Sequence, residues 1–298
     1  MRENVNWRAA LPELELYEQA PLRERTTFRI GGPARWFLCP KSVAEAGEIL
    51  KLCHENGIEP FFFGNGSNIL AADGGYDGVI LSSARLNALT LEDGRVIAQS
   101  GVLLAKLAHF AAEHSLTGLE FAQGIPGSVG GGVRMNAGAY GGELKDAVVW
   151  VEALDETGEV RRIAAHECEF SYRRSIFCNA PLFITAACFA LKPGEAGEIR
   201  AAMEDFAQRR REKQPLTYPS AGSTFKRPEG HFAAALIDQC GLKGLRVGGA
   251  QVSEKHAGFV VNVGNATAAD VLAVMEQVKT AVAAQTGVTL EPEVEILG

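Results

Sequence analysis

The stretch of sequence that decides the fold runs from residue 118 to residue 143 and reads GLEFAQGIPGSVGGGVRMNAGAYGGE. Eight glycines fall between Gly124 and Gly142. Glycine weakens a regular helix or strand, so a chain concentrates it where φ must be positive or where another group must approach the backbone. Backbone N–H groups that no side chain covers can point together at an anion. We interpret this stretch as a phosphate-binding turn; the alternative is a glycine-rich turn that binds no ligand.

The glycine spacing matches neither common phosphate motif. A P-loop ends in Gly-Lys-Ser/Thr and a dinucleotide fingerprint reads G-x-G-x-x-G, whereas Gly124, Gly127 and Gly130 give G-x-x-G-x-x-G. A second glycine turn, Gly64-Asn65-Gly66-Ser67-Asn68, follows a predicted buried strand at 60–63. Two such turns in one α+β region suggest a pyrophosphate gripped from both sides. The absence of the fingerprint and of the lysine favours a dinucleotide such as FAD, which is kept rather than transferred, in a fold other than the Rossmann fold.

Composition excludes several classes of protein. The chain has 298 residues, 47% hydrophobic and 22% charged, with a net charge of −7. These values are ordinary for a globular protein of two or three domains, and the negative charge argues against a nucleic-acid partner. The six cysteines form no C-x-x-C motif, so we expect reduced thiols, no metal site and a cytoplasmic location. No apolar run is long enough to span a membrane, and the N-terminus lacks an apolar signal core.

The pattern along the chain predicts an α+β protein. Residues 1–25 are expected to form a loose arm or a short helix. Strands are expected at 35–39, 60–63, 79–81, 95–100, 148–154, 159–163, 182–191, 246–253, 259–263 and 288–297. Helices are expected after Ser42, at 103–114, 199–213 and 231–240, and between Thr267 and Gly287. A composition shift at Pro193-Gly194 marks a boundary, so the expected domains are 1–80, 81–195 and 196–298.

Three further places carry candidate reactive groups. Tyr172-Arg173 follows a strand, and an arginine there could clamp a carboxylate, although a surface ion pair is the more common outcome. Ser223 lies in a loop of small residues that could expose its hydroxyl, although a turn-forming serine is the simpler explanation. Alternation places three acids of the last strand on one side, where they could form a solvated edge or face a cleft: Glu291, Glu293 and Glu295.

Taken in this order, these motifs resemble the UDP-N-acetylenolpyruvoylglucosamine reductases, flavoenzymes that complete UDP-N-acetylmuramate for peptidoglycan. The resemblance runs from Thr26-Thr27-Phe28 to Glu293-Val294. It rests on six motifs in order: Gly64–Asn68, Gly124–Gly131, Met135–Gly141, Tyr172-Arg173, Ala221-Gly222-Ser223 and Pro292-Glu293-Val294. It implies an FAD-binding domain of the vanillyl-alcohol-oxidase type in two subdomains, followed by a C-terminal α+β substrate-binding domain. Neither glycine turn contains His or Cys, so non-covalent FAD is expected.

The resemblance also implies the site residues. The catalytic residues would be Arg173 and Glu293, which stabilise charge at the substrate carboxylate, and Ser223, which donates a proton. The substrate would also contact Tyr172, Lys226, Arg227 and His231, with Lys226 as a candidate cation beside Ser223. The cofactor would contact Gly64, Asn65, Gly66, Ser67, Asn68, Gly124, Ile125, Pro126, Gly127, Ser128, Gly130, Gly131, Asn136 and Gly138.

The implied reaction uses NADPH to reduce FAD, after which the flavin delivers hydride to the enolpyruvyl substrate. Negative charge then develops on a group that is already anionic, and the site must stabilise it. Glu293 can help only as a hydrogen-bond donor, so a raised pKa is expected. No tyrosine lies between Arg174 and Thr217, which resembles the shorter branch of the family, without the tyrosine loop that closes over the substrate.

Two alternatives remain at this stage: another FAD-dependent oxidoreductase of the same fold, such as a sugar or alcohol oxidase, and a non-catalytic nucleotide-binding protein. The sequence does not determine the oligomeric state; a monomer is the expectation.

Overall fold

The computed structural model describes residues 5–298, which form two compact units built from interleaved segments. The first unit comprises the described residues up to 18 together with 36–65 and 78–209; the second comprises 19–35, 66–77 and 210–298. The division into 1–80, 81–195 and 196–298 stays a prediction. Residues 1–4 of the expected N-terminal arm lie outside the described residues.

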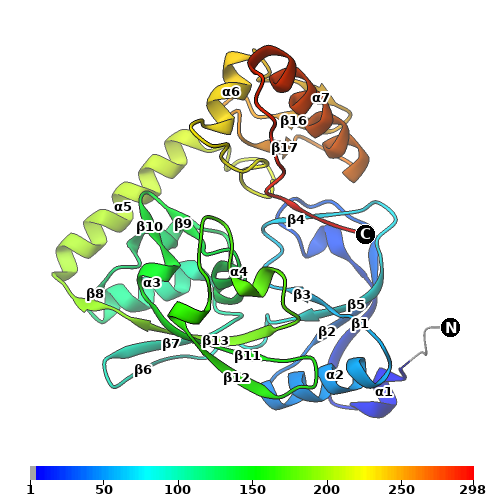
Figure 1. The fold of residues 1–298 in the computed structure, drawn as a ribbon, viewed down its shortest axis with the longest axis vertical. Helices are drawn as coiled ribbons and strands as arrows, with labels where there is room; N and C mark the ends of the chain where they lie inside the picture. Colours follow the sequence, from blue (N-terminus) through cyan, green and yellow to red (C-terminus); the bar gives the residue numbers. More distant parts are fainter. Residues whose placement is uncertain (1–4) are drawn as a thin grey trace. The chain divides into compact units, whose positions relative to one another are not determined.

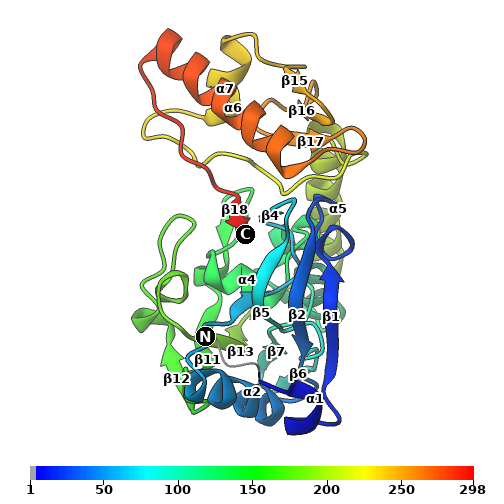
Figure 2. The same cartoon turned by 90° about the vertical axis from the view of Figure 1, so that its right-hand side faces the viewer.

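A four-stranded sheet opens the chain, in the order β1-β2-β5-β3 (Figure 2). Its strands are β1 (Glu15–Pro21), β2 (Pro33–Cys39), β5 (Tyr76–Ser82) and β3 (Phe61–Phe63), and β3 runs parallel to β5. Helix α2 (Val43–Glu55) joins β2 to β3, which confirms the expected strand–helix–strand opening. Of the loose arm or short helix expected at 1–25, the short helix is present at Trp7–Ala10, but the strand that follows was not expected. This segment contains the short helix α1 (Trp7–Ala10), all of β1 and the 3-10 turn η1 (Leu22–Glu24). Strand β1 has a single buried position, so its sequence lacks a buried alternation.

The start of α2 is the one that the sequence predicts. Ser42 Oγ accepts a hydrogen bond from Glu45 N at 3.1 Å, which satisfies one unpaired donor of the first turn. In a full capping box the Glu45 carboxylate would accept from Ser42 N. Here it accepts from Lys41 N instead, at 2.6 Å. Gly57 follows the helix with φ +62°, a left-handed value that glycine adopts without strain.

A five-stranded antiparallel sheet forms the centre of the first unit (Figure 1). Its order is β12 (Val160–Ala164), β11 (Val148–Leu154), β13 (Phe183–Ala190), β7 (Arg95–Gln99) and β6 (Leu89–Glu92). Strand β6 was missed, because it is mostly exposed and shows no apolar run. Helices α3 (Leu104–Glu113) and α4 (Val129–Arg134) share one hydrophobic core with this sheet. They contribute Leu104, Leu107, Val129 and Val133 to it. Shorter elements of this unit are β8 (Leu116–Thr117), η2 (Glu120–Gly124), β9 (Gly138–Ala139), β10 (Gly142–Glu143), η3 (Leu144–Asp146), η4 (Ala165–Glu167), η5 (Ile176–Cys178) and β14 (Lys192–Pro193). The long helix α5 (Ala196–Lys213) also belongs to this unit for most of its length.

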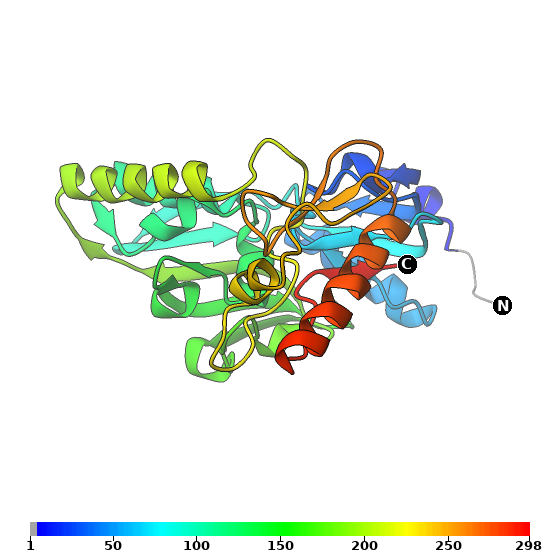
Figure 3. The same cartoon turned by 90° about the horizontal axis from the view of Figure 1, so that it is seen from above.

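The second unit packs helices against a small sheet. Strands β15 (Arg246–Val247), β16 (Ala250–Val252) and β17 (Val260–Asn262) lie beside α7 (Ala268–Thr286), with α6 (Ala233–Gln239) next to it (Figure 2). Helix α7 is one uninterrupted helix (orange to red in Figure 3), ended by Gly287 at φ +72°. The apolar stripe that the sequence predicts is buried: Val271, Val274, Met275, Val278 and Val282.

Two predicted strands of this unit are wrong in extent. The run 246–253 is split into β15 and β16 at Gly248-Gly249, where a Cβ on Gly249 would meet the Gly264 carbonyl at 2.3 Å. The run 288–297 is reduced to β18 (Glu295–Leu297), which pairs in parallel with β4 (Ile69–Ala71). Glu291 and Glu293 therefore lie before the strand, so the three acids do not share one side of it.

The thiols and helices of the described residues add two facts. All six cysteines are free, and burial raises the pKa of Cys53 to about 12 and that of Cys168 to about 11. Among residues 5–298, no helix has the length and apolarity needed to cross a membrane.

Asp73 fixes the start of α7 from a distant part of the sequence. Its Oδ1 accepts from Ala268 N at 2.8 Å and its Oδ2 from Ala269 N at 3.0 Å. A carboxylate at this position both caps two donors and complements the helix dipole. We expect Asp73→Ala to lower the free energy of unfolding by about 1–2 kcal/mol, measured by urea titration. The matched control is Asp77→Ala, since the Asp77 side chain is 82% exposed and lies 3.3 Å from Arg35. Equal losses in the two variants would contradict the capping role.

Candidate functional site

The two glycine turns meet in the first unit. Asn65 Nδ2 donates to the Pro126 carbonyl at 2.7 Å. A Cβ on Gly64 would lie 2.7 Å from Ser128 Oγ, so the backbone at 64 and the Ser128 side chain are in close approach. The expected pairing of the two turns is therefore present for residues 64–65 and 126–131. The chain then passes into the second unit between Asn65 and Gly66.

The run Val129–Arg134 is a short helix, α4, and not the open turn that the glycines suggested. Its glycines serve close packing, because a Cβ on Gly130 would meet Ser100 Cβ at 2.9 Å and one on Gly132 would meet Leu144 Cδ1 at 2.9 Å. The N–H groups of Val129 and Gly130 donate to the carbonyls of Val102 and Ser100, each at 2.8 Å. These two donors are thus not available to an anion.

A pocket of about 290 Å³ opens beside these turns. Its lining joins Gly64, Asn65 and Ser128 to Ser83, Ala84, Asn87, Gly101, Val102, Leu103 and Lys106. The Ser128 hydroxyl is buried and, within residues 5–298, has no hydrogen-bond partner. Lys106 is exposed and makes no ion pair with a described residue. Sequence reasoning missed Lys106, because its place in the α3 pattern is that of an ordinary solvated lysine.

A second, narrower pocket of about 50 Å³ shares Gly64 and Ser83 with the first. Gly130 and Gly131 line it together with a largely apolar wall. That wall consists of Phe62, Phe63, Phe177, Leu182, Phe183 and Ile184, with Arg134 beside it. Sequence reasoning did not assign these residues to a site, since they read as core strand residues. None of the residues lining either pocket is His or Cys.

The rest of the second glycine turn belongs to the second unit. Gly66 O accepts from Thr27 N at 3.1 Å, and Asn68 O accepts from Glu295 N at 2.9 Å. Asn68 Nδ2 donates to the Glu293 carbonyl at 3.0 Å. This turn therefore helps to hold the segment that carries Glu293.

Tyr172 and Arg173 form the tip of a tight turn in the first unit. Ser171 and Arg174 exchange two main-chain hydrogen bonds, of 3.0 Å and 3.2 Å. Arg173 has φ +55°, a left-handed value that costs a non-glycine residue energy and often marks a functional position. Its guanidinium lies 5.3 Å from the centre of the Tyr172 ring, and its Nη2 lies 3.4 Å from the Gly138 carbonyl.

The side chain of Asn136, expected to contact the cofactor, is directed into the protein interior instead. It is fully buried, and its amide group is used inside the protein. Nδ2 donates to Glu143 Oε2 at 3.0 Å and to Ser171 O at 3.1 Å, while Oδ1 accepts from Lys145 N at 3.0 Å. Both side-chain protons are thus taken, which leaves a cofactor only the main chain of Asn136.

The segments that carry Ser223 and Glu293 are paired within the second unit. Phe225 and Pro292 form an antiparallel bridge. On either side of it, Lys226 N donates to Glu291 O at 2.9 Å and Glu293 N donates to Thr224 O at 2.8 Å. The Ser223 hydroxyl is half-buried and makes no hydrogen bond with any described residue. The structure thus pairs the serine loop with the glutamate segment, which spacing alone could not establish.

The other predicted substrate residues lie on the loop after Ser223. Lys226 Nζ forms an exposed ion pair with Glu291 Oε2 at 3.3 Å. The Arg227 guanidinium stacks on the Phe232 ring at 4.5 Å, and Phe232 is 61% exposed. His231 is exposed on the same loop.

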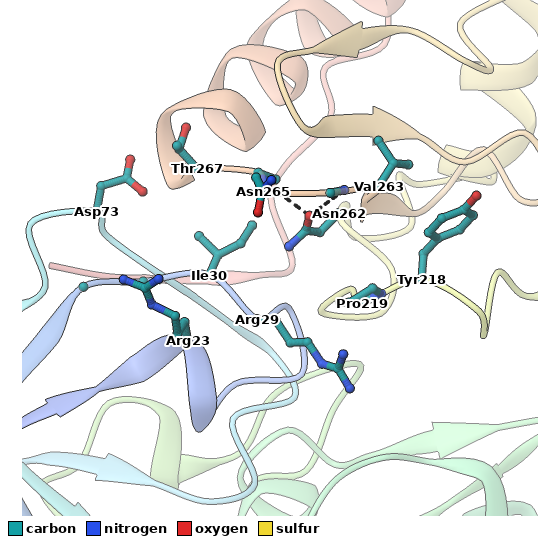
Figure 4. A pocket seen from close by; sticks show the side chains of 14 residues that line it. Arg23, Arg29, Ile30, Asp73, Tyr218, Pro219, Asn262, Val263, Asn265 and Thr267 are labelled. Carbon is teal, nitrogen blue, oxygen red and sulfur yellow. Dashed lines mark hydrogen bonds between the residues drawn. The ribbon is translucent and has the colours of Figure 1, made fainter.

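The second unit has a pocket of its own, of about 590 Å³ (Figure 4). Asn262 stands on its wall, where Oδ1 accepts from Gly264 N at 3.0 Å and Ala266 N at 3.2 Å. Arg23 and Arg29 contribute two cationic side chains from the segment before Gly31-Gly32. None of the residues predicted for a site lines this pocket. Sequence reasoning treated the Gly-Gly-Pro segment only as a turn. Within residues 5–298, no cluster of three or more His, Cys, Asp or Glu could hold a metal ion.

Comparison with known proteins agrees with this geometry. Residues 34–164 match the family described as FAD binding domain, and residues 214–297 match the C-terminal domain of UDP-N-acetylenolpyruvoylglucosamine reductase. A protein of that name from Clostridium novyi is 46% identical over 99% of this chain and 96% of its own. One from Staphylococcus epidermidis is 44% identical over 97% and 94%. The crystal structure of the Thermus caldophilus reductase (MurB) has a TM-score of 0.82 at 33% identity, covering 96% of this chain and 99% of that one.

Glycine turns that meet beside an unpaired hydroxyl, together with the FAD-binding domain, define an FAD-dependent oxidoreductase of α+β fold. The FAD-binding domain is of the vanillyl-alcohol-oxidase type, as expected, and a separate C-terminal domain follows it. The chain belongs to the UDP-N-acetylenolpyruvoylglucosamine reductase family.

The first unit fits part of this cofactor. The exposed backbone at Gly64, the Ser128 hydroxyl and the Lys106 ammonium suit a phosphate, and the phenylalanine wall suits a planar ring. A pocket of about 290 Å³ is at the small end of cofactor sites, which usually have about 300–1,000 Å³. A whole dinucleotide therefore extends beyond it.

Gly64 is the position at which a single methyl group tests this site. Gly64→Ala would place a Cβ against Ser128 Oγ, in the space beside the bare backbone. We expect roughly tenfold weaker FAD binding, the equivalent of about 1.4 kcal/mol of overpacking. Flavin absorbance relative to protein absorbance after dialysis measures it. Gly197→Ala in α5 is the matched control, since nothing lies within 4 Å of a Cβ there. Full flavin retention by Gly64→Ala would contradict the assignment.

Proposed function

We propose that this protein reduces UDP-N-acetylglucosamine enolpyruvate to UDP-N-acetylmuramate with NADPH, as a step of peptidoglycan precursor synthesis. The observation that carries this proposal is the pairing of residues 224–226 with 291–293, which holds the segment that carries Ser223 against the segment that carries Glu293. It occurs in a chain 46% identical to a protein named for this reductase activity. An oxidase of the same fold would have no need for Arg173, Ser223 and Glu293 together.

FAD, when bound, supplies a hydride carrier that is reduced by NADPH and oxidised by the enolpyruvyl double bond. The residues that hold it are proposed to be the two glycine turns and the helix that follows. The pocket linings support six of the positions inferred from sequence: Gly64, Asn65, Ser128, Gly130, Gly131 and, through its contact with Asn65, Pro126. Lys106 is added as a phosphate contact. The absence of His and Cys from the linings supports non-covalent attachment.

Arg173 is proposed to bind the carboxylate of the enolpyruvyl group. Hydride addition to the terminal carbon moves negative charge towards that carboxylate. A guanidinium can hold both oxygens through two parallel hydrogen bonds and is always protonated. Tyr172 packs on the guanidinium and is proposed to contact the substrate beside it.

Glu293 and Ser223 are proposed to complete the reaction at the same substrate. Glu293 helps at an anionic group only as a protonated donor, so a raised pKa in the complex stays part of this proposal. Ser223 donates a proton to the carbon next to the carboxylate. Its hydroxyl makes no hydrogen bond with residues 5–298, so it can donate to a bound substrate.

The exposed loop from Lys226 to Phe232 is proposed to contact the sugar nucleotide. It begins at the bridge that holds Ser223 and carries Lys226, Arg227 and His231. Lys226 is paired with Glu291, so its part as the cation beside Ser223 requires that this exposed pair opens. Such pairs are weak, about 0–1 kcal/mol. A cytoplasmic location and a monomeric state belong to the same proposal.

Anaerobic stopped-flow absorbance in the flavin band tests the function. NADPH should bleach the oxidised protein, and UDP-N-acetylglucosamine enolpyruvate should then restore the colour much faster than oxygen does. Bleaching without recovery by the enolpyruvyl compound would contradict the substrate assignment. Faster recovery with oxygen would favour the oxidase alternative, and a colourless or NADPH-inert protein would favour a non-catalytic one.

A further inference from the structure

We propose that Asn136 is a positioning residue, which fixes the turn that carries Arg173 to the helix that borders the cofactor pocket. The inference rests on the proposed role of Arg173 and extends it to a residue outside the reacting groups. It is argued from contacts that all lie within the first unit.

Asn136 stands at the end of α4 in a conformation that suits asparagine. Its N–H donates to Val133 O at 3.1 Å, and its φ is +42°. Asparagine tolerates the left-handed region at a helix end better than most residues do. The backbone therefore aims the side chain away from the helix, towards two other segments.

The first of these segments is the arginine turn. Ser171 O accepts from Arg174 N at 3.2 Å, which closes the turn, and from Asn136 Nδ2 at 3.1 Å. The same carbonyl thus fixes the turn internally and ties it to α4. Because Arg173 has the strained value of φ +55°, the turn needs surrounding contacts to keep this conformation.

The second segment is the hairpin of β9 and β10. Its Glu143 carboxylate accepts from Asn136 Nδ2 at 3.0 Å and from Lys145 Nζ at 2.6 Å. The Lys145 ammonium, and with it the Asn136 amide and the Arg173 guanidinium, lowers the pKa of Glu143. The hairpin also supplies Gly138 O, 3.4 Å from Arg173 Nη2. The hairpin therefore presents an anion and a carbonyl to the guanidinium.

The Asn136 side chain contacts both the arginine turn and the hairpin, and its main chain directly follows α4. Through α4 it is connected to Gly130 and Gly131, which line the cofactor pocket. Through Ser171 it holds Arg173. A shift of about 1 Å between reacting groups can cost about 10²-fold in rate, so a residue that fixes this distance can control the reaction without touching substrate.

Asn136→Asp tests the inference with an isosteric change. The new carboxylate cannot donate to Ser171 O, and it faces Glu143 directly. We expect the recovery of flavin colour with the enolpyruvyl substrate to slow about 10²-fold, with little change in the NADPH step. Flavin binding, measured by fluorescence quenching, should stay within about threefold of wild type, since the pocket lining is intact.

The pH dependence separates positioning from general damage. The charged groups around position 136 are Glu143, Lys145, Asp146 and Arg173. Burial and the Glu143 carboxylate raise the pKa of an aspartate placed there. Protonation then recreates a donor, so the variant should recover as the pH falls from about 8 to about 6, relative to wild type. A merely destabilised protein would not recover in this way.

A second variant covers the case in which the aspartate prevents folding. Asn136→Gly keeps the left-handed backbone and removes all three side-chain hydrogen bonds, so it should show the same slow recovery without the pH rescue. Asn179→Asp is the control, because it makes the same chemical change at an exposed asparagine of the first unit, and it should recover at the wild-type rate. If wild type recovers with the enolpyruvyl substrate and both Asn136 variants match it at every pH, the inference is wrong. If wild type itself fails to recover, the proposed function is wrong instead.

Discussion

Replacement of Ser223 by alanine should leave the NADPH step unchanged and slow the return of flavin colour with the enolpyruvyl substrate by about 10²–10⁴-fold, the usual contribution of a positioned proton donor. The hydroxyl is half-buried and makes no hydrogen bond within residues 5–298, so its removal leaves no unpaired partner among them. The loop itself is held by main-chain bonds of Thr224 and Lys226, which alanine at 223 does not alter.

The measurement is anaerobic stopped-flow absorbance with the two substrates added in turn. Ser220→Ala is the control, since it removes a hydroxyl from the same loop and leaves the Ser220 carbonyl free to accept from Thr27 at 2.7 Å. A Ser223→Ala enzyme that recovers its colour at the wild-type rate would remove Ser223 from the mechanism. The free energy of unfolding of Ser223→Ala should differ from that of the wild type by less than about 0.5 kcal/mol, as for other replacements that break no contact.

Replacement of Arg173 by alanine should slow the return of flavin colour with the enolpyruvyl substrate by about 10²–10³-fold, as the loss of a preorganised charge contact does. The lysine variant should lose less, because it keeps the charge but not the two-pronged geometry. Both effects arise at the substrate carboxylate, so the NADPH step should stay near the wild-type rate.

Arg174→Ala gives a control of equal charge in the same turn, since the Arg174 side chain is exposed and the main-chain bonds to Ser171 remain. Equal losses in Arg173→Ala and Arg174→Ala would indicate a general effect of charge, and no loss in either would contradict the assigned role. Higher salt should weaken the substrate affinity of the control more than its rate, because exposed charges act mainly at long range.

The sequence predicted the local structure best where a short pattern carries the whole cause. Ser42 caps the start of α2. In α7 the apolar stripe from Val271 to Val282 is buried, and the helix ends at Gly287. Both signals can be read from neighbouring residues: the cap pairs Ser42 with Glu45, and the stripe from Val271 to Val282 has helical spacing. The same holds for the hairpin of β11 and β12, whose strands are joined by a turn containing Gly158 at φ +84°.

The errors lie where distant segments decide. The glycines of Val129–Arg134 predicted a turn, yet they form a helix because Ser100, Leu104 and Leu144 need the space that side chains would fill. The last strand is short, since Glu291 and Glu293 pair with residues 224–226 instead. Strand β1 has a single buried position, so no periodic signal marked it.

By itself the sequence determined the family resemblance, the α+β class and the candidate residues, because these depend on residue types in a fixed order. Only the tertiary structure decided that the segment after Ser223 pairs with the Glu293 segment, that Asn136 holds the Arg173 turn and that Lys106 lines the pocket beside Gly64 and Ser128. The physical reason is that the first two contacts join residues 69 and 35 positions apart (Thr224 with Glu293, and Asn136 with Ser171), and hydrogen bonds over such separations depend on packing that no local pattern encodes.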